Sequence, residues 1–274
     1  MSWAVVARKD FEDAARSKML WAITVLFVLT TAGGMYAYDA MNSNPSAADA
    51  INWLGTPASL IIPLAALVVA YLAIAGERES GSIKLLLGLP HTRGDVVFGK
   101  LVGRAVVVGV ATLVAFVAGA AVLLVNYGTV PVVDFAVLGV LTLLFATAFV
   151  GIAIGFSSLA ATRSRAMAGA IGLFFVFQLI WDFVPLGVYY VVEGGLPTGE
   201  LPPWFFLVQV LNPKNAYSTL STLLINENAT TQFEAVLGEV PFYLDSWFLF
   251  VILLAWLVVP VVLGYLRFRS VDLS

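Results

Sequence analysis

The strongest constraint on this chain is a set of six long apolar stretches that are almost free of charged residues. A helix needs about 20 apolar residues to cross a hydrocarbon core of about 30 Å. One buried helix of a soluble protein can imitate such a stretch, but six in a chain of 274 residues cannot all be buried that way. The stretches are Leu20–Tyr38, Ile51–Ala75, Ala105–Val125, Phe135–Thr162, Ala166–Val184 (with Asp182 near its end) and Trp247–Leu266. They predict an all-α bundle of six transmembrane helices.

Composition excludes several other classes of protein. The chain is 61% hydrophobic and 11% charged, whereas an average soluble domain is about 45–50% apolar and about 25% charged. So few charges cannot coat a soluble globule, and disorder requires low hydrophobicity. The net charge of −3 leaves no basic face for nucleic acid. The lack of cysteine excludes disulfides and thiolate metal sites.

The positions of the basic residues predict how the bundle is oriented. If the N-terminus is cytoplasmic, 13 of the 14 basic residues fall on the inside and only Lys214 falls outside. Basic residues in short loops determine topology. We therefore expect a multi-pass protein of the cell membrane with both termini cytoplasmic. The inside residues are Arg8, Lys9, Arg16, Lys18, Arg78, Lys84, Arg93, Lys100, Arg104, Arg163, Arg165, Arg267 and Arg269.

The segments outside the spans complete a single transmembrane domain over residues 1–274. Residues 1–18 carry an amphipathic stripe, which predicts a helix lying in the membrane interface or a simple flank of the first span. The apolar face holds Trp3, Val6, Ala7, Phe11, Ala14 and Ala15, and the polar face holds Arg8, Lys9, Glu12, Asp13 and Arg16. Residues 193–246 form an extracellular segment. Within it Trp204–Ile225 is interrupted by Asn212 and Pro213, which predicts short helices on or dipping into the outer interface.

The inside loop over residues 76–100 is the most informative part of the chain. The charged residues Glu77, Arg78 and Glu79 follow the second span, and Ser80-Gly81-Ser82 then provides a break with helix-capping chemistry. A short apolar helix over 83–87 follows, and 92–95 offers a second cap. Its exposed apolar side chains require a groove or the membrane surface. The loop is therefore either a docking element for a cytoplasmic partner or a segment packed on its own bundle.

This loop resembles that of a known family. The pattern Glu77-x-Glu79-x-Gly81-Ser82-Ile83-x-x-Leu86-x-x-x-Pro90-x-x-Arg93, followed by Gly99-Lys100, resembles the inside loop of ABC-2 type permeases, the membrane subunits of ATP-driven exporters. The predicted layout of the whole chain agrees with this resemblance. Leu211-Asn212-Pro213 further resembles the branch associated with the maturation of multicopper enzymes such as nitrous oxide reductase.

The resemblance implies a function and partners. It implies a permease that couples ATP hydrolysis by a separate ABC ATP-binding subunit to substrate movement, with ATP and Mg²⁺ held there and no cofactor in this chain. A second permease copy, identical or different, would complete the transporter in membrane lipid. The residues it assigns to partner coupling are Glu77, Arg78, Glu79, Gly81, Ser82, Ile83, Leu86, Pro90 and Arg93.

Other motifs fit less well. Gly94-x-x-x-x-Gly99-Lys100 matches most of a phosphate-binding loop, but Leu101 replaces the required Ser or Thr and no strand precedes it. The lone His91 has no companions for a catalytic or metal site. We therefore expect no catalytic, cofactor or metal residues, and the chain is not expected to be an enzyme. The alternative function is a stand-alone secondary transporter or channel, which usually has charges at mid-membrane or matching broken helices.

Two further features carry expectations about packing. The pair Gly151-x-x-x-Gly155 allows close approach between helices, and we expect it to act within the subunit. Asp182 lies 16 residues after Ala166, or about 24 Å along a helix. This depth predicts an acid near the outer boundary, with a helix break at Pro185 and Gly187.

Overall fold

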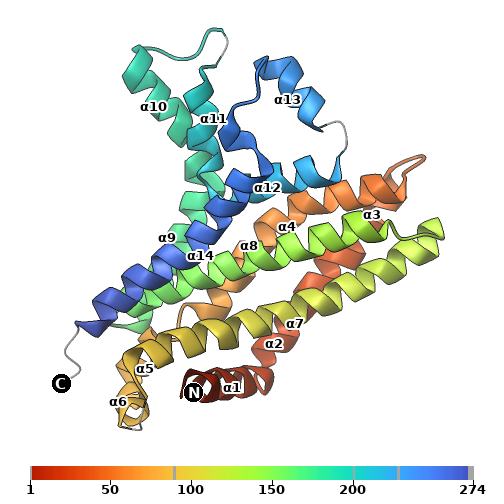
Figure 1. Cartoon of the computed structure of the whole chain (residues 1–274). Helices are drawn as coiled ribbons and strands as arrows, with labels where there is room; N and C mark the ends of the chain where they lie inside the picture. The colour runs from red at the N-terminus through yellow and green to blue at the C-terminus, as the bar shows by residue number, and fades with distance from the viewer. Residues whose placement is uncertain (1, 89–90, 200, 227–228, 271–274) are drawn as a thin grey trace.

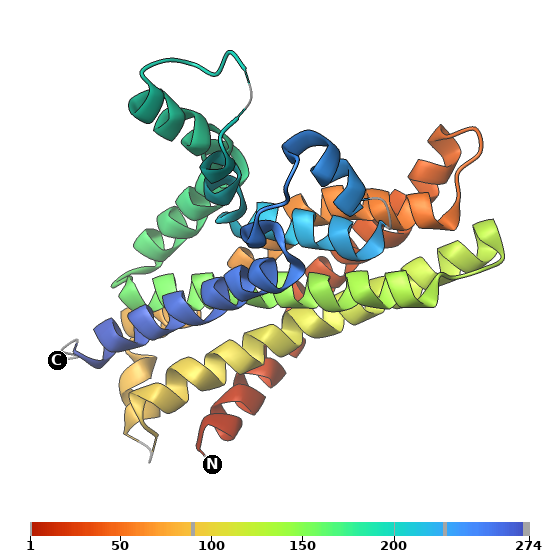
Figure 2. The same ribbon diagram turned by 45° about the horizontal axis from the view of Figure 1, so that its top comes forward.

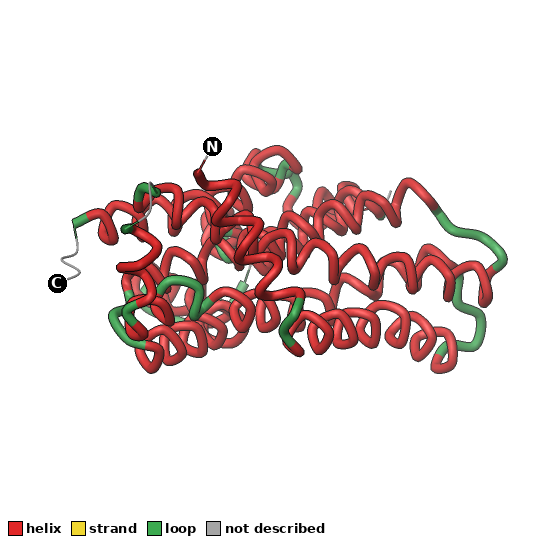
Figure 3. Tube along the Cα trace, turned by 90° about the horizontal axis from the view of Figure 1, so that it is seen from below, coloured by secondary structure: helices red, strands yellow, loops and turns green. Residues whose placement is uncertain are grey.

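The chain forms a helical bundle. The computed structural model describes residues 2–88, 91–199, 201–226 and 229–270, and within these ranges it contains helices and no strand (Figure 3). Six helical segments are long and apolar enough to cross a membrane, as predicted. They are Lys18–Met41 (α2 Lys18–Val28, η1 Leu29–Gly33, α3 Gly34–Met41), Ala47–Ser80 (α4 Ala47–Ala70, α5 Ala75–Ser80), α7 Arg93–Tyr127, α8 Val132–Leu159, Arg163–Glu193 (α9 Arg163–Phe175, η2 Val176–Ile180, η3 Trp181–Phe183, α10 Val184–Glu193) and α14 Ser246–Arg269.

Both termini lie at one end of the bundle, which we call the basic end. The N-terminal helix α1 (Ser2–Ala15), α5, the short helix α6 (Ser82–Leu87) and the C-terminal part of α14 gather there (Figure 1). The helices α10, α11 (Pro203–Val210) and α13 (Ala229–Leu237) lie far from that end (Figure 1). The short helix η4 (Phe242–Leu244) leads into α14.

Helix α8 is the centre of the bundle. It contacts α14, α4, α7 and α12 (Pro213–Ile225), and its sequence is apolar on all sides, as expected for a buried helix. The predicted glycine pair lies against α14. A Cβ added to Gly151 would be 2.6 Å from the Leu257 carbonyl oxygen. A Cβ added to Gly155 would overlap the Pro260 carbonyl oxygen. The pair therefore packs two spans of the same subunit, as predicted.

The segment Trp204–Ile225 folds into the two short helices that its sequence predicted, α11 and α12. Helix α12 packs against α4, α8 and α14 rather than lying apart from the bundle. Its Tyr217 is completely buried, stacks on Phe145 with ring centroids 4.3 Å apart, and shares a 2.9 Å hydrogen bond with the Thr142 hydroxyl. A polar side chain so deep in an apolar bundle requires such a partner.

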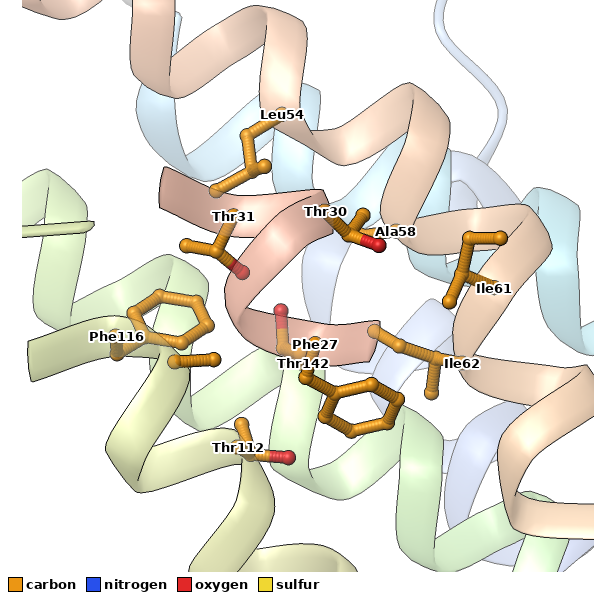
Figure 4. Close-up of a pocket in the computed structure, with 11 residues that line it drawn as sticks. Phe27, Thr30, Thr31, Leu54, Ala58, Ile61, Ile62, Thr112, Phe116 and Thr142 are labelled. Atoms are coloured by element: carbon orange, nitrogen blue, oxygen red, sulfur yellow. The ribbon is translucent and has the colours of Figure 1, made fainter. Parts of the chain in front are cut away.

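A small cavity lies between the π-helical turn η1 and helices α4, α7 and α8 (Figure 4). Thr31, Thr112 and Thr142 line it together with apolar side chains such as Phe27 and Leu54. Its volume is about 20 Å³, which is enough for one water molecule. This cavity is therefore too small to hold a molecule much larger than water.

The structure adds detail to one predicted segment and corrects one predicted boundary. Helices α5 and α6 occupy most of residues 76–88, and α7 begins at Arg93, before the apolar stretch that starts at Ala105. The predicted cap sets this start: the Thr92 hydroxyl accepts from the Asp95 N–H, and the Asp95 carboxylate accepts from the Thr92 N–H at 2.9 Å. The fifth helical segment continues to Glu193, and its irregular turn lies over 176–183 rather than at Pro185. Pro185 stands in the first turn of α10, where proline is tolerated.

The contact between α8 and α14 gives a first testable prediction. Gly155→Ala should lower the unfolding temperature of the purified protein in detergent, because the new methyl group must displace the α14 backbone; overpacking of this kind costs about 1–3 kcal/mol. The matched control is Gly172→Ala on α9, where nothing lies within 4 Å of the added Cβ. Equal melting of the two variants would show that the helices are not in close contact.

Candidate functional site

Helix α1 lies directly on α7 because two glycines of α7 have no side chains. A Cβ on Gly99 would be 2.7 Å from the Trp3 carbonyl oxygen, and a Cβ on Gly103 would be 2.9 Å from that of Ala7. Their four-residue spacing places both on one face of α7. The predicted helix of the N-terminal segment is confirmed, and its polar residues Arg8, Lys9, Glu12, Asp13 and Arg16 are exposed as expected.

Four charged side chains meet where α1 crosses α7, and we call them the ionic cluster: Asp10, Glu77, Lys100 and Arg104. The Lys100 Nζ lies 2.7 Å from Glu77 Oε1 and 3.3 Å from Asp10 Oδ1. The Arg104 Nε lies 2.8 Å from Asp10 Oδ2, and its Nη2 donates to Asp10 Oδ1 at 3.0 Å. The cluster thus joins α1, α5 and α7.

The cluster is buried and its formal charges cancel. The side chains of Lys100 and Asp10 are 4% and 5% exposed, those of Arg104 and Glu77 18% and 30%. Arg104 Nη1 also donates to the Val69 carbonyl oxygen of α4 at 3.0 Å. Removing one partner of a buried ion pair leaves the other charge uncompensated in an apolar environment. The cluster is therefore a stiff joint between four helices.

Sequence reasoning missed Asp10, and it counted Lys100 and Arg104 only as basic residues on the inside, without a partner. The signal was available, because Asp10 is four residues from both Val6 and Ala14 and so belongs to the apolar face of α1. An acid on an apolar face needs a buried cation. The cluster also accounts for the partial phosphate-loop motif: Gly99 admits α1, and Lys100 binds two carboxylates.

The other two charged residues of α5 hold the connection between α8 and α9. Arg78 Nη1 donates to the carbonyl oxygen of Ala160 at 2.8 Å. The Glu79 carboxylate accepts from the backbone N–H of Arg163 at 2.5 Å, at the first residue of α9, where a helix favours negative charge. The Ser157 hydroxyl accepts from the N–H groups of Ile74 and Ala75 at 3.1 and 3.0 Å. Helix α5 is thus bonded to both sides of the bundle.

Helix α6 continues from α5 through a sharp turn at Gly81, whose φ of 77° favours glycine. Part of the helix follows the second predicted alternative, packing on its own bundle. Ile83 is 1% exposed and Leu86 is partly buried on the bundle, whereas Leu85 is 79% exposed. Ser82 is exposed at the start of the helix, and Pro90 lies outside the described residues. The other alternative, docking of a partner, stays a prediction.

Arg93 lies apart from α5 and serves a different contact. Its Nη1 donates to the carbonyl oxygens of Phe268 and Arg269 at 2.6 and 2.9 Å, and its guanidinium lies 5.4 Å from the centre of the Phe268 ring. A cation at the C-terminus of a helix is favourable. The predicted coupling residues thus form two groups, with α5–α6 on one side and Arg93 at the end of α14 on the other.

Comparison with known families decides the identity of this arrangement. Residues 4–273 match the family described as ABC-2 family transporter protein. The chain belongs to this family. It is therefore a multi-pass membrane protein and a permease subunit of an ABC transporter, and the family implies an ATP-binding partner.

Two curated relatives are similar over most of the permease. The chain is 33% identical over 232 residues to the probable ABC transporter permease protein NosY of Pseudomonas aeruginosa. The aligned region covers 79% of this chain and 80% of the relative. It is 31% identical over 272 residues to the probable ABC transporter permease protein NosY of Stutzerimonas stutzeri, and this aligned region covers 96% of both proteins.

The ionic cluster gives a second testable prediction, about the effect of one substitution on stability. Asp10→Asn in the permease should lower the unfolding temperature in detergent, because Lys100 and Arg104 lose a buried counter-charge, which costs about 3–5 kcal/mol. Asp13→Asn is the matched control, since Asp13 is exposed on the same helix and should change stability by about 0.5 kcal/mol or less. If the two variants unfold at the same temperature, the cluster does not hold α1.

Proposed function

We propose that this permease couples ATP hydrolysis by a separate subunit to the export of a substrate across the cell membrane, with α5 and α6 as the coupling element. The observation that carries the proposal is the contrast between these two helices. Helix α6 presents Leu85, 79% exposed, while α5 is bonded to α7 through Glu77 and to the α8–α9 connection through Arg78 and Glu79. A push on α6 is therefore transmitted to several spans.

The proposed mechanism is a shift in population between two arrangements of the bundle. ATP and Mg²⁺ bind in the partner subunit, whose closure displaces α6. Because Glu77 is paired with Lys100, the displacement reaches α7 and, through Asp10, helix α1. The partner can favour one arrangement only by binding it better than the other. The permease itself supplies motion and a path, without bond chemistry.

The proposed orientation places the basic end in the cytoplasm. Leu85 and the neighbouring Lys84 are exposed at that end, and 13 of 14 basic residues fall on that side, which agrees with the tendency of short cytoplasmic loops to be basic. Helix α1 would lie in the membrane interface with Arg8 and Lys9 toward the lipid head groups.

We further propose a second permease copy and a role in the maturation of multicopper enzymes. The space for a substrate would lie between the two copies. The Leu211-Asn212-Pro213 motif, which resembles that branch, and the similarity to two relatives named NosY support this assignment. The chain has no cysteine and its five methionines form no periodic ladder, so the cargo is not expected to be a bare copper ion.

Leu85 gives a test of partner docking. Leu85→Asp should reduce the amount of ATP-binding subunit that co-purifies with the permease by about tenfold or more, because burying a leucine contributes about 1.5–3 kcal/mol. The control is Leu196→Asp, an equally exposed leucine (69%) at the other end of the protein. Unchanged recovery with Leu85→Asp would argue strongly against docking at α6.

Single cysteines test the orientation. The natural chain has none, so Lys84→Cys and Thr198→Cys each give one labelling site, and both positions are exposed. A membrane-impermeant maleimide should label Thr198→Cys in intact cells and Lys84→Cys only after lysis. The opposite pattern would place α6 outside the cell and refute the coupling role.

A further inference from the structure

The fifth span changes its helical geometry part-way along its length. It is α-helical in α9, π-helical in η2, 3₁₀-helical in η3 and α-helical again in α10. The spacing of the backbone hydrogen bonds therefore changes three times between Phe175 and Val184. Stretches of this kind inside helices often mark functional hinges. Helix α10 leaves the rest of the bundle from this joint (Figure 2).

A side chain from another segment holds the joint. The buried Asn212 donates from Nδ2 to the Phe177 carbonyl oxygen of the π-helical turn at 2.7 Å. Its Oδ1 accepts from the backbone N–H of Lys214 at 2.8 Å and so caps α12. Trp256 of α14 donates to the Leu211 carbonyl oxygen at 2.8 Å. The motif Leu211-Asn212-Pro213 is thus a fixed point between α12, α14 and the fifth span.

The joint is also fixed to α4. Gln178 Nε2 donates to the Ser59 carbonyl oxygen at 2.9 Å. In a regular helix that carbonyl would accept from the N–H four residues on, but this residue is Pro63, which has none. The amide of Gln178 therefore satisfies the carbonyl that Pro63 leaves open. The side of the joint that faces the bundle is held by two buried hydrogen bonds.

The contact on the open side of the joint is much weaker. Lys214 Nζ lies 3.3 and 3.4 Å from the two Asp182 carboxylate oxygens and 3.5 Å from the Gln178 carbonyl oxygen. Strong charge-assisted hydrogen bonds are about 2.7–2.9 Å long. The Asp182 side chain is 51% exposed, and its predicted depth near the outer boundary of the membrane would let water and salt screen the pair. This pair can therefore open while the buried contacts stay closed.

Helices α10 and α11 lie beyond the joint as one unit, which we call the outer arm. They contact each other, and the rings of Tyr189 and Trp204 stack with centroids 6.0 Å apart. Trp181 Nε1 donates to the Val208 carbonyl oxygen at 3.0 Å. The chain enters the arm at η2–η3 and leaves it at Leu211. The hydrogen bond from Asn212 to the Phe177 carbonyl oxygen holds these two connections next to each other. The Tyr243 hydroxyl, which donates to the Pro203 carbonyl oxygen, limits how far the arm can swing.

We propose that the outer arm is a moving element that turns on the joint at Val176–Phe183, and that the Lys214–Asp182 pair is the latch that holds it in one position. Asn212 is a positioning residue, which keeps the joint in place while the latch opens. That the movement serves transport rests on the proposed function. The movement itself is a property of this chain and can be measured without a partner or substrate.

Spin-label distances test the latch. Val191→Cys on α10 and Val125→Cys at the end of α7, both 83% exposed, provide one labelled pair in the otherwise cysteine-free permease. Pulsed electron resonance in lipid nanodiscs should give one narrow distance with the natural latch. Asp182→Asn and Lys214→Met should each broaden and shift the distribution, and the exchange of Asp182→Lys with Lys214→Asp should restore it.

Two controls make the result decisive. Glu12→Gln removes an exposed ion pair with Arg8 elsewhere in the protein and should leave the distance unchanged. Salt at about 1 M, where the Debye length is about 3 Å, should broaden the distance with the natural latch as the neutral variants do. An unchanged distribution in both latch variants, or an exchange that restores nothing, would overturn the proposal. Neither result would bear on ATP coupling, which the Leu85 experiment tests separately.

Discussion

A polar group inside an apolar bundle must find its partner within the protein, and this constraint governs both ends of the permease. At the basic end, Asp10, Glu77, Lys100 and Arg104 satisfy one another across three helices. None of these helices can shift alone without exposing a charge to the apolar interior. In the proposed mechanism, a motor that moves α6 acts on a joint that is already stiff, which is the property a coupling element requires.

The same constraint operates through amides at the other end. Asn212 donates to a carbonyl group of the π-helical turn, and Gln178 satisfies the carbonyl group that a proline leaves without its regular partner. Neutral hydrogen bonds of this kind fix the inner side of the joint, while the longer contact between Lys214 and Asp182 remains open to solvent. The permease thus combines a rigid joint near the proposed motor with a looser one on the far side. Such a combination allows motion delivered at one end to appear as displacement at the other.

Much of this arrangement could be predicted from local sequence. The six spans follow from the apolar stretches, and the short helices before the last span follow from Asn212 and Pro213. The capping box at Thr92 and Asp95 was also predicted, but the ion pairs of Lys100 and Arg104 were not, because the carboxylate that both residues contact is not in the neighbouring sequence. Their partner is Asp10, 90 residues away from Lys100. In the same way, five apolar residues predicted helix α6, but only packing decides that Ile83 is buried and Leu85 is exposed.

The sequence by itself determined that the chain crosses a membrane six times and carries its basic residues mainly on one side. This is so because hydrophobicity, length and charge act locally, on each segment in turn. The tertiary structure alone decided which charges neutralise one another, which glycines admit a neighbouring helix, and where the fifth span bends. Those outcomes depend on side chains that are distant in sequence and meet only when the helices pack, so no local pattern contains them.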